Sequence, residues 1–161
     1  DFLIGDAFAD RCNLSLLKQD SYLYEDSDIR LLLMHGDTLC TDDQEYQDMR
    51  ATFRDDGWQQ AFLAKSIGER RDYAQALRAQ SRSRSADKPS DITDVNEATV
   101  IEVMEQVGVS QLLHGHTHRP QCHDVITRAG ESQRWVLGDW HADHAVYAVL
   151  DRGVITLETF R

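Results

Sequence analysis

Residues 31–37 read Leu-Leu-Leu-Met-His-Gly-Asp, and residues 109–118 read Val-Ser-Gln-Leu-Leu-His-Gly-His-Thr-His. In each stretch a short apolar run stops at residues that can bind a metal ion or titrate. Enzymes of the α/β class present active-site groups in this way, because buried strands end at one edge of a sheet and the loops that follow carry polar side chains. The two stretches therefore predict an α/β fold with a site at the strand ends.

The second stretch places His116 and His118 two residues apart, directly after Gly115. On a helix, side chains at positions i and i+2 diverge, whereas a loop or strand end can turn both rings into one cleft. We therefore expect a loop that carries two metal ligands. Neutral imidazole binds Mn, Fe, Zn, Co and Ni, so the residue type alone does not identify the metal.

The remaining histidines are expected to have other roles. His114 precedes the glycine and departs from the ligand spacing. We therefore expect it to be structural, or to orient the metal ligands without binding the metal itself. His141 and His144 follow a predicted strand near the sheet edge; a surface role is favoured, and contact of His141 with the site is the alternative. His123 is expected at the surface.

Alternating apolar residues between turn residues predict several strands. We expect a hairpin of residues 22–24 and 29–34 across Asp26-Ser27-Asp28, and a strand at 109–113. The further expected strands are 125–127, 134–137, 145–150 and 154–160, the last two joined across Asp151-Arg152-Gly153. The expected architecture is an α/β sandwich fragment that ends in a β-meander.

The region between the two histidine motifs is expected to be mostly helical. Across residues 44–84, aromatic and apolar residues recur at helical spacing, which predicts two or three amphipathic helices broken near Gly57 and Gly68. Residues 81–90 are rich in serine and charge, so a polar loop is expected there. Residues 91–107 restore the helical period, with a cap expected at Ser90 or Asp91 and a stop at the following glycine.

The composition limits the classes of protein. The chain has 161 residues, of which 41% are hydrophobic and 28% are charged, as expected of one globular domain with its own core. The formal net charge of −11 argues against non-specific nucleic-acid binding. Three cysteines without CxxC spacing predict free thiols in a reducing cytosol. No apolar run has bilayer-spanning length, and the apolar start without a signal peptide predicts a chain that begins inside a domain.

The motifs together resemble a known family. Residues 115–118 are similar to the closing motif of calcineurin-like metallophosphoesterases, and His35-Gly36-Asp37 is similar to their preceding single-histidine motif. Within this superfamily, the chain most resembles the UDP-2,3-diacylglucosamine diphosphatases of lipid A biosynthesis. The stretches that carry this resemblance are residues 1–5, 35–43, 93–96, 114–120 and 137–141.

The resemblance implies a double β-sandwich flanked by helices, with a helical lid inserted at residues 44–90 and two Mn²⁺ ions at the strand ends. By the family pattern, His35 and His116 bind one ion and His118 binds the other, so these three act in catalysis through the metals. Two divalent ions about 3.5–4 Å apart stabilise phosphoryl oxygens and lower the pKa of water. The implied reaction is hydrolysis of the pyrophosphate bond of UDP-2,3-diacylglucosamine at the α-phosphate, which releases UMP and 2,3-diacylglucosamine 1-phosphate.

The resemblance also implies residues that contact the substrate. They are Asp43, Ser81, Ser85, Lys88 and His116, with Arg78 as a further candidate for the sugar phosphate. Ser85 stands where the family pattern has an asparagine. An apolar lid cavity would bury acyl chains at about 0.8 kcal/mol per methylene, and the implied location is the cytoplasmic face of the inner membrane, as a peripheral protein. The alternatives are a solvated serine-rich linker and a helical region whose aromatic residues form an ordinary small core.

The first half of the family pattern, which supplies Asp-x-His, Gly-Asp and Gly-Asn-Arg motifs, is not found in this sequence. Residues 1–161 are therefore expected to be the C-terminal part of one metallophosphoesterase domain, and the isolated chain is expected not to hydrolyse the substrate. Two further interpretations stay open. One is another calcineurin-like phosphodiesterase or nucleotide hydrolase with a lid for a different substrate, and the other is an inactive fragment that binds metal weakly or not at all.

Overall fold

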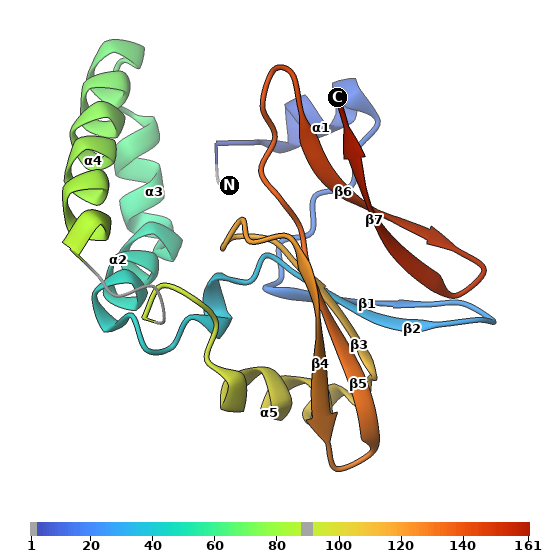
Figure 1. Ribbon diagram of the computed structural model, residues 1–161. Helices are drawn as coiled ribbons and strands as arrows, with labels where there is room; N and C mark the ends of the chain where they lie inside the picture. The colour runs from blue at the N-terminus through green and yellow to red at the C-terminus, as the bar shows by residue number, and fades with distance from the viewer. Residues whose placement is uncertain (1–2, 88–91) are drawn as a thin grey trace. The chain divides into compact units, whose positions relative to one another are not determined.

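A computed structural model describes the backbone of residues 3–87 and 92–161, and the side chains of all of these except 80–87. The chain divides into two compact units. Leu17–Cys40 and Val95–Arg161 form the sheet unit, which carries both histidine motifs. Asp1–Leu16 and Thr41–Asp94 form the helical unit (Figure 1).

A five-stranded mixed sheet organises the sheet unit. Its strands are β1 (Ser21–Glu25), β2 (Arg30–Met34), β3 (Gln111–His114), β4 (Gln121–Thr127) and β5 (Gly130–Val136), in the order β1-β2-β3-β5-β4. β2, β3 and β5 run parallel to one another, whereas β1 and β4 lie antiparallel to their neighbours at the two edges. The expected α/β class is confirmed, and so is the β1–β2 hairpin.

The β1–β2 turn is stabilised by the side chain of Asp26, one of the turn residues predicted from the sequence. Asp26 Oδ1 accepts hydrogen bonds from the backbone N–H groups of Asp28 at 2.8 Å and Ile29 at 3.0 Å. An aspartate that binds the backbone two or three residues ahead fixes a tight turn without help from the rest of the fold. The turn is therefore determined locally.

One face of the sheet packs against helix α5 (Glu97–Val107). Val100 and Met104 of this helix lie in one apolar cluster with Leu32 of β2, Leu112 of β3 and Val125 of β4. The expectation that the helix begins at residue 91 is wrong. It begins after Asn96, whose Oδ1 accepts from Thr99 N at 3.0 Å, while Asn96 N donates to Leu39 O at 2.8 Å. Gly108 ends the helix in the left-handed conformation, as expected.

The other face of the sheet packs against a two-stranded sheet, β6 (Ala145–Asp151) and β7 (Val154–Phe160). Ile155 and Ala148 of this hairpin cluster with Leu31 and Leu33 of β2. Because successive strand residues face opposite sides, Leu31 and Leu33 serve this layer and Leu32 serves the α5 layer. The continuous leucine run of β2 is thus explained by a strand that is covered on both faces.

The helical unit contains α1 (Asp6–Cys12), α2 (Gln44–Arg54), α3 (Asp56–Leu63) and α4 (Ile67–Asp87), while a short 3₁₀ turn (Asp37–Leu39) belongs to the sheet unit. The expected helix breaks near Gly57 and Gly68 fall slightly earlier, at residues that cap the next helix. Asp55 Oδ1 accepts from Trp58 N at 2.7 Å. Ser66 and Glu69 form a reciprocal capping box, in which Ser66 N donates to Glu69 Oε2 at 2.8 Å and Glu69 N donates to Ser66 Oγ at 3.3 Å.

The expected polar loop at residues 81–90 is wrong where it can be checked. Helix α4 continues through residues 81–87, and residues 88–90 lie outside the described chain. Arginine and alanine alternate with serine through this segment and are good helix formers, so a helix that is already started propagates through it. The polar composition that suggested a loop is therefore also compatible with a helix.

Four aromatic rings hold the three long helices of this unit together. Trp58 stacks on Phe62 with ring centroids 5.2 Å apart, and it also contacts Phe53 at 4.8 Å and Tyr73 at 6.0 Å. Phe62 and Tyr73 meet edge to face at 5.5 Å. These rings form a small core of their own. Across the described residues, no helix is both long enough and apolar enough to span a bilayer.

Candidate metal centre

Three polar loops meet at one edge of the sheet. Because β2, β3 and β5 are parallel, the loops that follow them, at residues 35–37, 115–118 and 137–141, leave the sheet at the same edge. Backbone hydrogen bonds connect the loops: Gly115 N donates to His35 O at 3.0 Å, and Leu137 N donates to His114 O at 2.8 Å. The site edge predicted from the two apolar runs is therefore formed, and a third loop joins it.

The first and second loops bring two histidine rings together. The ring centroids of His35 and His116 lie 5.1 Å apart with an interplanar angle of 53°. His35 is exposed, and its Nδ1 lies 3.1 Å from Oδ1 of the buried Asp37. A carboxylate on one ring nitrogen fixes the ring and leaves the other nitrogen as a donor for a metal ion. Asp37 therefore orients His35.

The second loop has an unusual backbone. His116 and His118 adopt φ values of 69° and 53°, in the left-handed region, and Gly36 of the first loop has φ 108°. Left-handed residues other than glycine are uncommon, and they persist where the surroundings fix them, often at functional sites. Two such histidines separated by one residue form a tight turn, in which His118 is exposed and His116 is half-buried.

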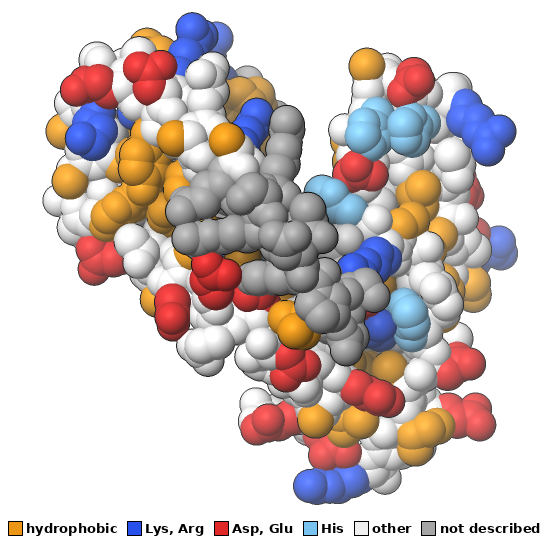
Figure 2. Space-filling view, turned by 60° about the vertical axis from the view of Figure 1, so that its left-hand side comes forward, with side chains coloured by type: hydrophobic (Ala, Val, Ile, Leu, Met, Phe, Trp, Pro, Cys, Tyr) orange, Lys and Arg blue, Asp and Glu red, His pale blue; other side chains and the backbone are white. Residues whose placement is uncertain are grey.

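The third loop adds a carboxylate beside His118. Asp139 Oδ2 lies 3.9 Å from His118 Nδ1 and 2.6 Å from His141 Nε2. Desolvation alone would raise the pKa of Asp139, but the hydrogen bond from His141, together with the nearby imidazoles, outweighs it and keeps the pKa below the ordinary value. The His141 and His144 rings stack with centroids 4.3 Å apart. Figure 2 shows exposed histidine side chains next to acidic ones.

The donor chemistry of this edge fits a divalent transition metal only in part. Imidazole nitrogens lie about 2 Å from a bound metal, and rings whose centroids are 5.1 Å apart can share one ion. However, the described residues contain no group of three His, Cys, Asp or Glu side chains placed to hold one. The buried hydroxyl of Thr117, between the two histidines, also has no hydrogen-bond partner among the described residues. The edge thus offers candidate ligands, but its described residues do not form a closed coordination shell.

The predicted substrate residues that the structure describes belong to the helical unit, apart from His116. Asp43 is largely buried, and its Oδ1 accepts from Tyr46 N at 3.1 Å, so it caps helix α2. Arg78 is an exposed residue of α4. Ser81 and Ser85 lie on the helical backbone of α4, and Lys88 falls outside the described residues.

Sequence reasoning missed three residues of the sheet unit. Asp37 and Asp139 orient histidines. Each directly follows a glycine that is the second residue after a strand, a signal that was already present in the motifs. Arg134 is largely buried and places Nη1 3.0 Å from Nε2 of His114, whose exposed fraction is 0%. The 20-residue separation of this pair gave no local signal. The structural role expected of His114 agrees with its burial.

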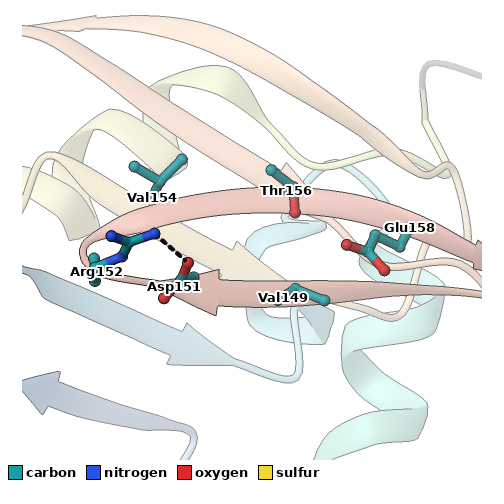
Figure 3. A pocket seen from close by; sticks show the side chains of 6 residues that line it. All are labelled: Val149, Asp151, Arg152, Val154, Thr156 and Glu158. Atoms are coloured by element: carbon teal, nitrogen blue, oxygen red, sulfur yellow. Dashed lines mark hydrogen bonds and ion pairs between the residues drawn. The ribbon is translucent and has the colours of Figure 1, made fainter.

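A shallow hollow elsewhere on the sheet unit contains none of the predicted site residues. It lies on the hairpin β6–β7 and is lined by Val149, Asp151, Arg152, Val154, Thr156 and Glu158, with an ion pair between Asp151 and Arg152 at 3.3 Å (Figure 3). Its rim is mostly exposed and carries both signs of charge. The hollow does not belong to the histidine edge.

The mixed sheet with histidine loops at its parallel strand ends is compatible with a metallophosphoesterase. Known proteins make the likeness specific. The chain is 43% identical over 143 residues to a protein of Aromatoleum aromaticum named UDP-2,3-diacylglucosamine hydrolase, which is 89% of this chain and 58% of that protein. Proteins with the same name from Bordetella pertussis and Chromobacterium violaceum are each 45% identical, over 90% and 96% of this chain and 56% and 64% of their own lengths. No family model matches the chain.

These similarities confirm the expected resemblance to UDP-2,3-diacylglucosamine hydrolases. The chain spans 56–64% of the length of these three relatives. The matched region covers nearly the whole chain, so it includes the loops at the histidine edge.

Proposed function

We propose that the protein hydrolyses the pyrophosphate bond of UDP-2,3-diacylglucosamine at the α-phosphate, and that the histidine edge of this chain supplies part of a two-metal site. UMP and 2,3-diacylglucosamine 1-phosphate would be the products. The identity of 43–45% to hydrolases named for this substrate carries the proposal. The convergence of His35 and His116, with ring centroids 5.1 Å apart, supports it independently.

Each histidine has a proposed task. His35 and His116 would hold one Mn²⁺ and His118 the other, and the two cations would stabilise charge on the phosphoryl oxygens and activate water for attack on phosphorus. Asp37 keeps Nδ1 of His35 engaged, so Nε2 is left for the metal. Asp139 lies between His118 and His141. Its carboxylate favours orientations of these two imidazole rings in which a ring nitrogen faces it. No group of three His, Cys, Asp or Glu side chains among the described residues is placed to hold an ion, so further ligands would be needed.

We assign the acyl chains of the substrate to the helical unit, as a lid over a double β-sandwich domain. The four-ring core indicates which surface is available, because Phe53, Trp58, Phe62 and Tyr73 already contact one another. Leu63 and Ile67, at the α3–α4 junction, are 44% and 65% exposed, and we assign the acyl contact to these two side chains. Such a lid suits a peripheral enzyme at the cytoplasmic face of the inner membrane.

The first test removes the proposed ligands one at a time from the intact protein. His35→Ala, His116→Ala and His118→Ala should each lower Mn²⁺-dependent turnover of UDP-2,3-diacylglucosamine by a factor of 100 or more, because a ligand of the metal pair is lost. His123→Ala, on β4, is the matched control and should keep wild-type turnover. Undiminished turnover in any of the three would remove that residue from the metal site.

The second test separates this substrate from other phosphoesters. Leu63→Ser combined with Ile67→Ser should reduce turnover of the diacylated substrate far more than turnover of a small chromogenic phosphodiester. Ile126→Ser is the matched control, because Ile126 on β4 is 68% exposed, like Ile67. Equal losses on both substrates would contradict the acyl role and favour a phosphodiesterase with another substrate.

A further inference from the structure

We propose that the buried imidazole of His114, fixed in one tautomer by Arg134, positions the two histidine loops relative to each other. The inference rests on the proposed metal site and deepens it. His114 is not placed as a ligand. It lies behind the ligands, between the loop at residues 35–37 and the loop at residues 115–118, and it sets the spacing of His35 and His116 through the backbone that it contacts.

The tautomer follows from the hydrogen-bond partners of the ring. Arg134 Nη1 lies 3.0 Å from His114 Nε2, and a guanidinium can only donate. Nε2 must therefore carry the lone pair. In the neutral ring the proton is then on Nδ1, and the carbonyl oxygen of Gly115 is 2.9 Å from that nitrogen, ready to accept it. Both ring nitrogens are thus engaged on a side chain with no exposed surface, as a buried polar group requires.

The ring also contacts the first loop. A Cβ atom at Gly36 would lie 2.7 Å from His114 Nδ1 and 3.0 Å from Gly115 O, closer than side-chain atoms normally approach. The imidazole therefore occupies the space directly against the backbone between His35 and Asp37. Gly115 N donates to His35 O at 3.0 Å, so the loops are bonded beside the ring as well. Displacement of the ring would move both loops.

Packing alone does not explain this arrangement. An aromatic or aliphatic residue could fill the position of His114 without requiring a buried arginine, and burial of a guanidinium carries a desolvation penalty. The His114–Arg134 pair additionally fixes the direction of the hydrogen bond that the ring donates. The Nδ1–H points at the Gly115 carbonyl, and this fixes the peptide that leads into His116. His114 and Arg134 are therefore positioning residues.

The tautomer can be measured directly. Two-bond ¹H–¹⁵N correlation spectra of the intact metal-free protein should show His114 protonated at Nδ1 and unprotonated at Nε2. Arg134→Met should remove this preference and shift the ring resonances of His35 and His116, whereas Arg128→Met, at an exposed arginine on the β4–β5 turn, should change none of them. A wild-type His114 protonated at Nε2, or His35 and His116 resonances that ignore Arg134→Met, would overturn the proposal.

Metal binding gives the second readout. His114→Phe keeps an aromatic ring but loses both hydrogen bonds, and Arg134→Met keeps the imidazole should the first variant fail to fold. Each should bind Mn²⁺ about 10–100-fold more weakly than wild type, the usual effect of losing a group that orients a ligand. His114→Asn, whose amide can still donate to Gly115 O, should recover part of the affinity lost in His114→Phe.

These outcomes separate the two proposals. Wild-type protein that binds Mn²⁺ tightly but leaves UDP-2,3-diacylglucosamine intact would contradict the proposed substrate and leave the positioning role supported. Folded His114→Phe and Arg134→Met variants with wild-type Mn²⁺ affinity would overturn the positioning role, whatever the substrate. If His114 and Arg134 had a structural role alone, their substitution would lower the melting temperature, and His114→Asn would recover none of the Mn²⁺ affinity lost in His114→Phe.

Discussion

The histidine edge and the helical unit are built by different means. At the edge, three loops are joined by backbone hydrogen bonds and buried groups, such as Gly115 N to His35 O and the ring of His114. In the helical unit, α2, α3 and α4 are held by side-chain contacts among four aromatic rings, and of the α2 and α3 residues only Phe62 is buried. The edge is therefore the more rigid construction, and the helical unit is suited to local opening.

This contrast predicts which kind of substitution each region tolerates least. A loop fixed by close backbone packing has no room for an extra atom, so addition should be more harmful there than removal. A cluster of partly exposed rings tolerates small additions, and it weakens when a ring is removed. The predictions below test this contrast.

The largest effect is expected for Gly36→Ala. The added Cβ would meet His114 and Gly115, at a residue whose φ of 108° already disfavours any side chain. Overpacking and strain together should lower the free energy of unfolding by about 3 kcal/mol or more. Urea denaturation of the intact protein measures this.

Gly130→Ala is the matched control for that prediction. Gly130 has a similar φ of 117°, but a Cβ there meets nothing within 4 Å. Only the backbone strain remains, so a loss of about 1–2 kcal/mol is expected. Equal losses at the two glycines would show that the edge is not closely packed.

Removal of a ring should weaken the helical unit locally. Trp58→Ala deletes three ring contacts and should lower the stability of helices α2 to α4 by about 2 kcal/mol, with little effect on the sheet. Hydrogen exchange followed by mass spectrometry would show faster exchange in peptides from residues 44–79. Trp140→Ala, at a residue that is 74% exposed, should change neither region by more than about 0.5 kcal/mol. Faster exchange in β2 and β3 after Trp58→Ala would mean that the units are not separable.

Helix caps provide a matched pair of smaller perturbations. Asn96→Ala removes the cap of α5 in the sheet unit, and Asp55→Ala removes the cap of α3 in the helical unit. Each should cost about 1 kcal/mol. The loss from Asn96→Ala should appear in global unfolding by urea, because α5 covers the core of the sheet. The loss from Asp55→Ala should appear mainly as faster exchange in α3, and the reverse pattern would contradict the contrast between the regions.

The smallest effect concerns pH. Backbone hydrogen bonds from Asp28 first, and then the hydroxyl of Tyr24, hold the pKa of Asp26 below its ordinary value of 3.8. A lowered pKa means that the stabilisation is complete above the ordinary value and is lost as the pH falls through the folded-state pKa. Asp26→Ala should therefore be slightly less stable than wild type at neutral pH, and the difference should shrink in strong acid. A difference that did not depend on pH, measured by thermal unfolding, would contradict the charge-assisted turn.

Strands and turns were predictable because their causes are local. The leucine run of β2, the Asp26 turn and the Asp151-Arg152-Gly153 turn each depend on neighbouring residues, and the structure confirms all three. Helix ends were less predictable, because an apolar period does not show which polar residue caps. At α5, Asn96 is the cap because it hydrogen-bonds to both Thr99 and Leu39. Leu39 is 57 residues away in the sequence.

The candidate site divides in the same way. The edge itself and the closeness of His35 and His116 follow from motifs at the ends of parallel strands, which sequence can indicate. The contact between Arg134 and His114 could not be predicted, because only the strand order of the sheet brings these two residues together. The roles of His35, His116 and His118 as ligands, and of the residues from Asp43 to Lys88 in substrate binding, stay predictions.

The left-handed backbone at His116 and His118 has a consequence for engineering and for evolution. A residue other than glycine in this conformation lowers the stability of the folded state by about 1–2 kcal/mol. Glycine at either position would therefore relieve the backbone strain of the loop, but it would also delete a proposed ligand. Selection for thermal stability alone would then favour variants with a damaged site, a trade-off between stability and activity that is common where a functional loop is strained. A thermostable variant of this protein should accordingly be selected for turnover and for melting temperature together, since the second criterion alone removes the histidines that the first one requires.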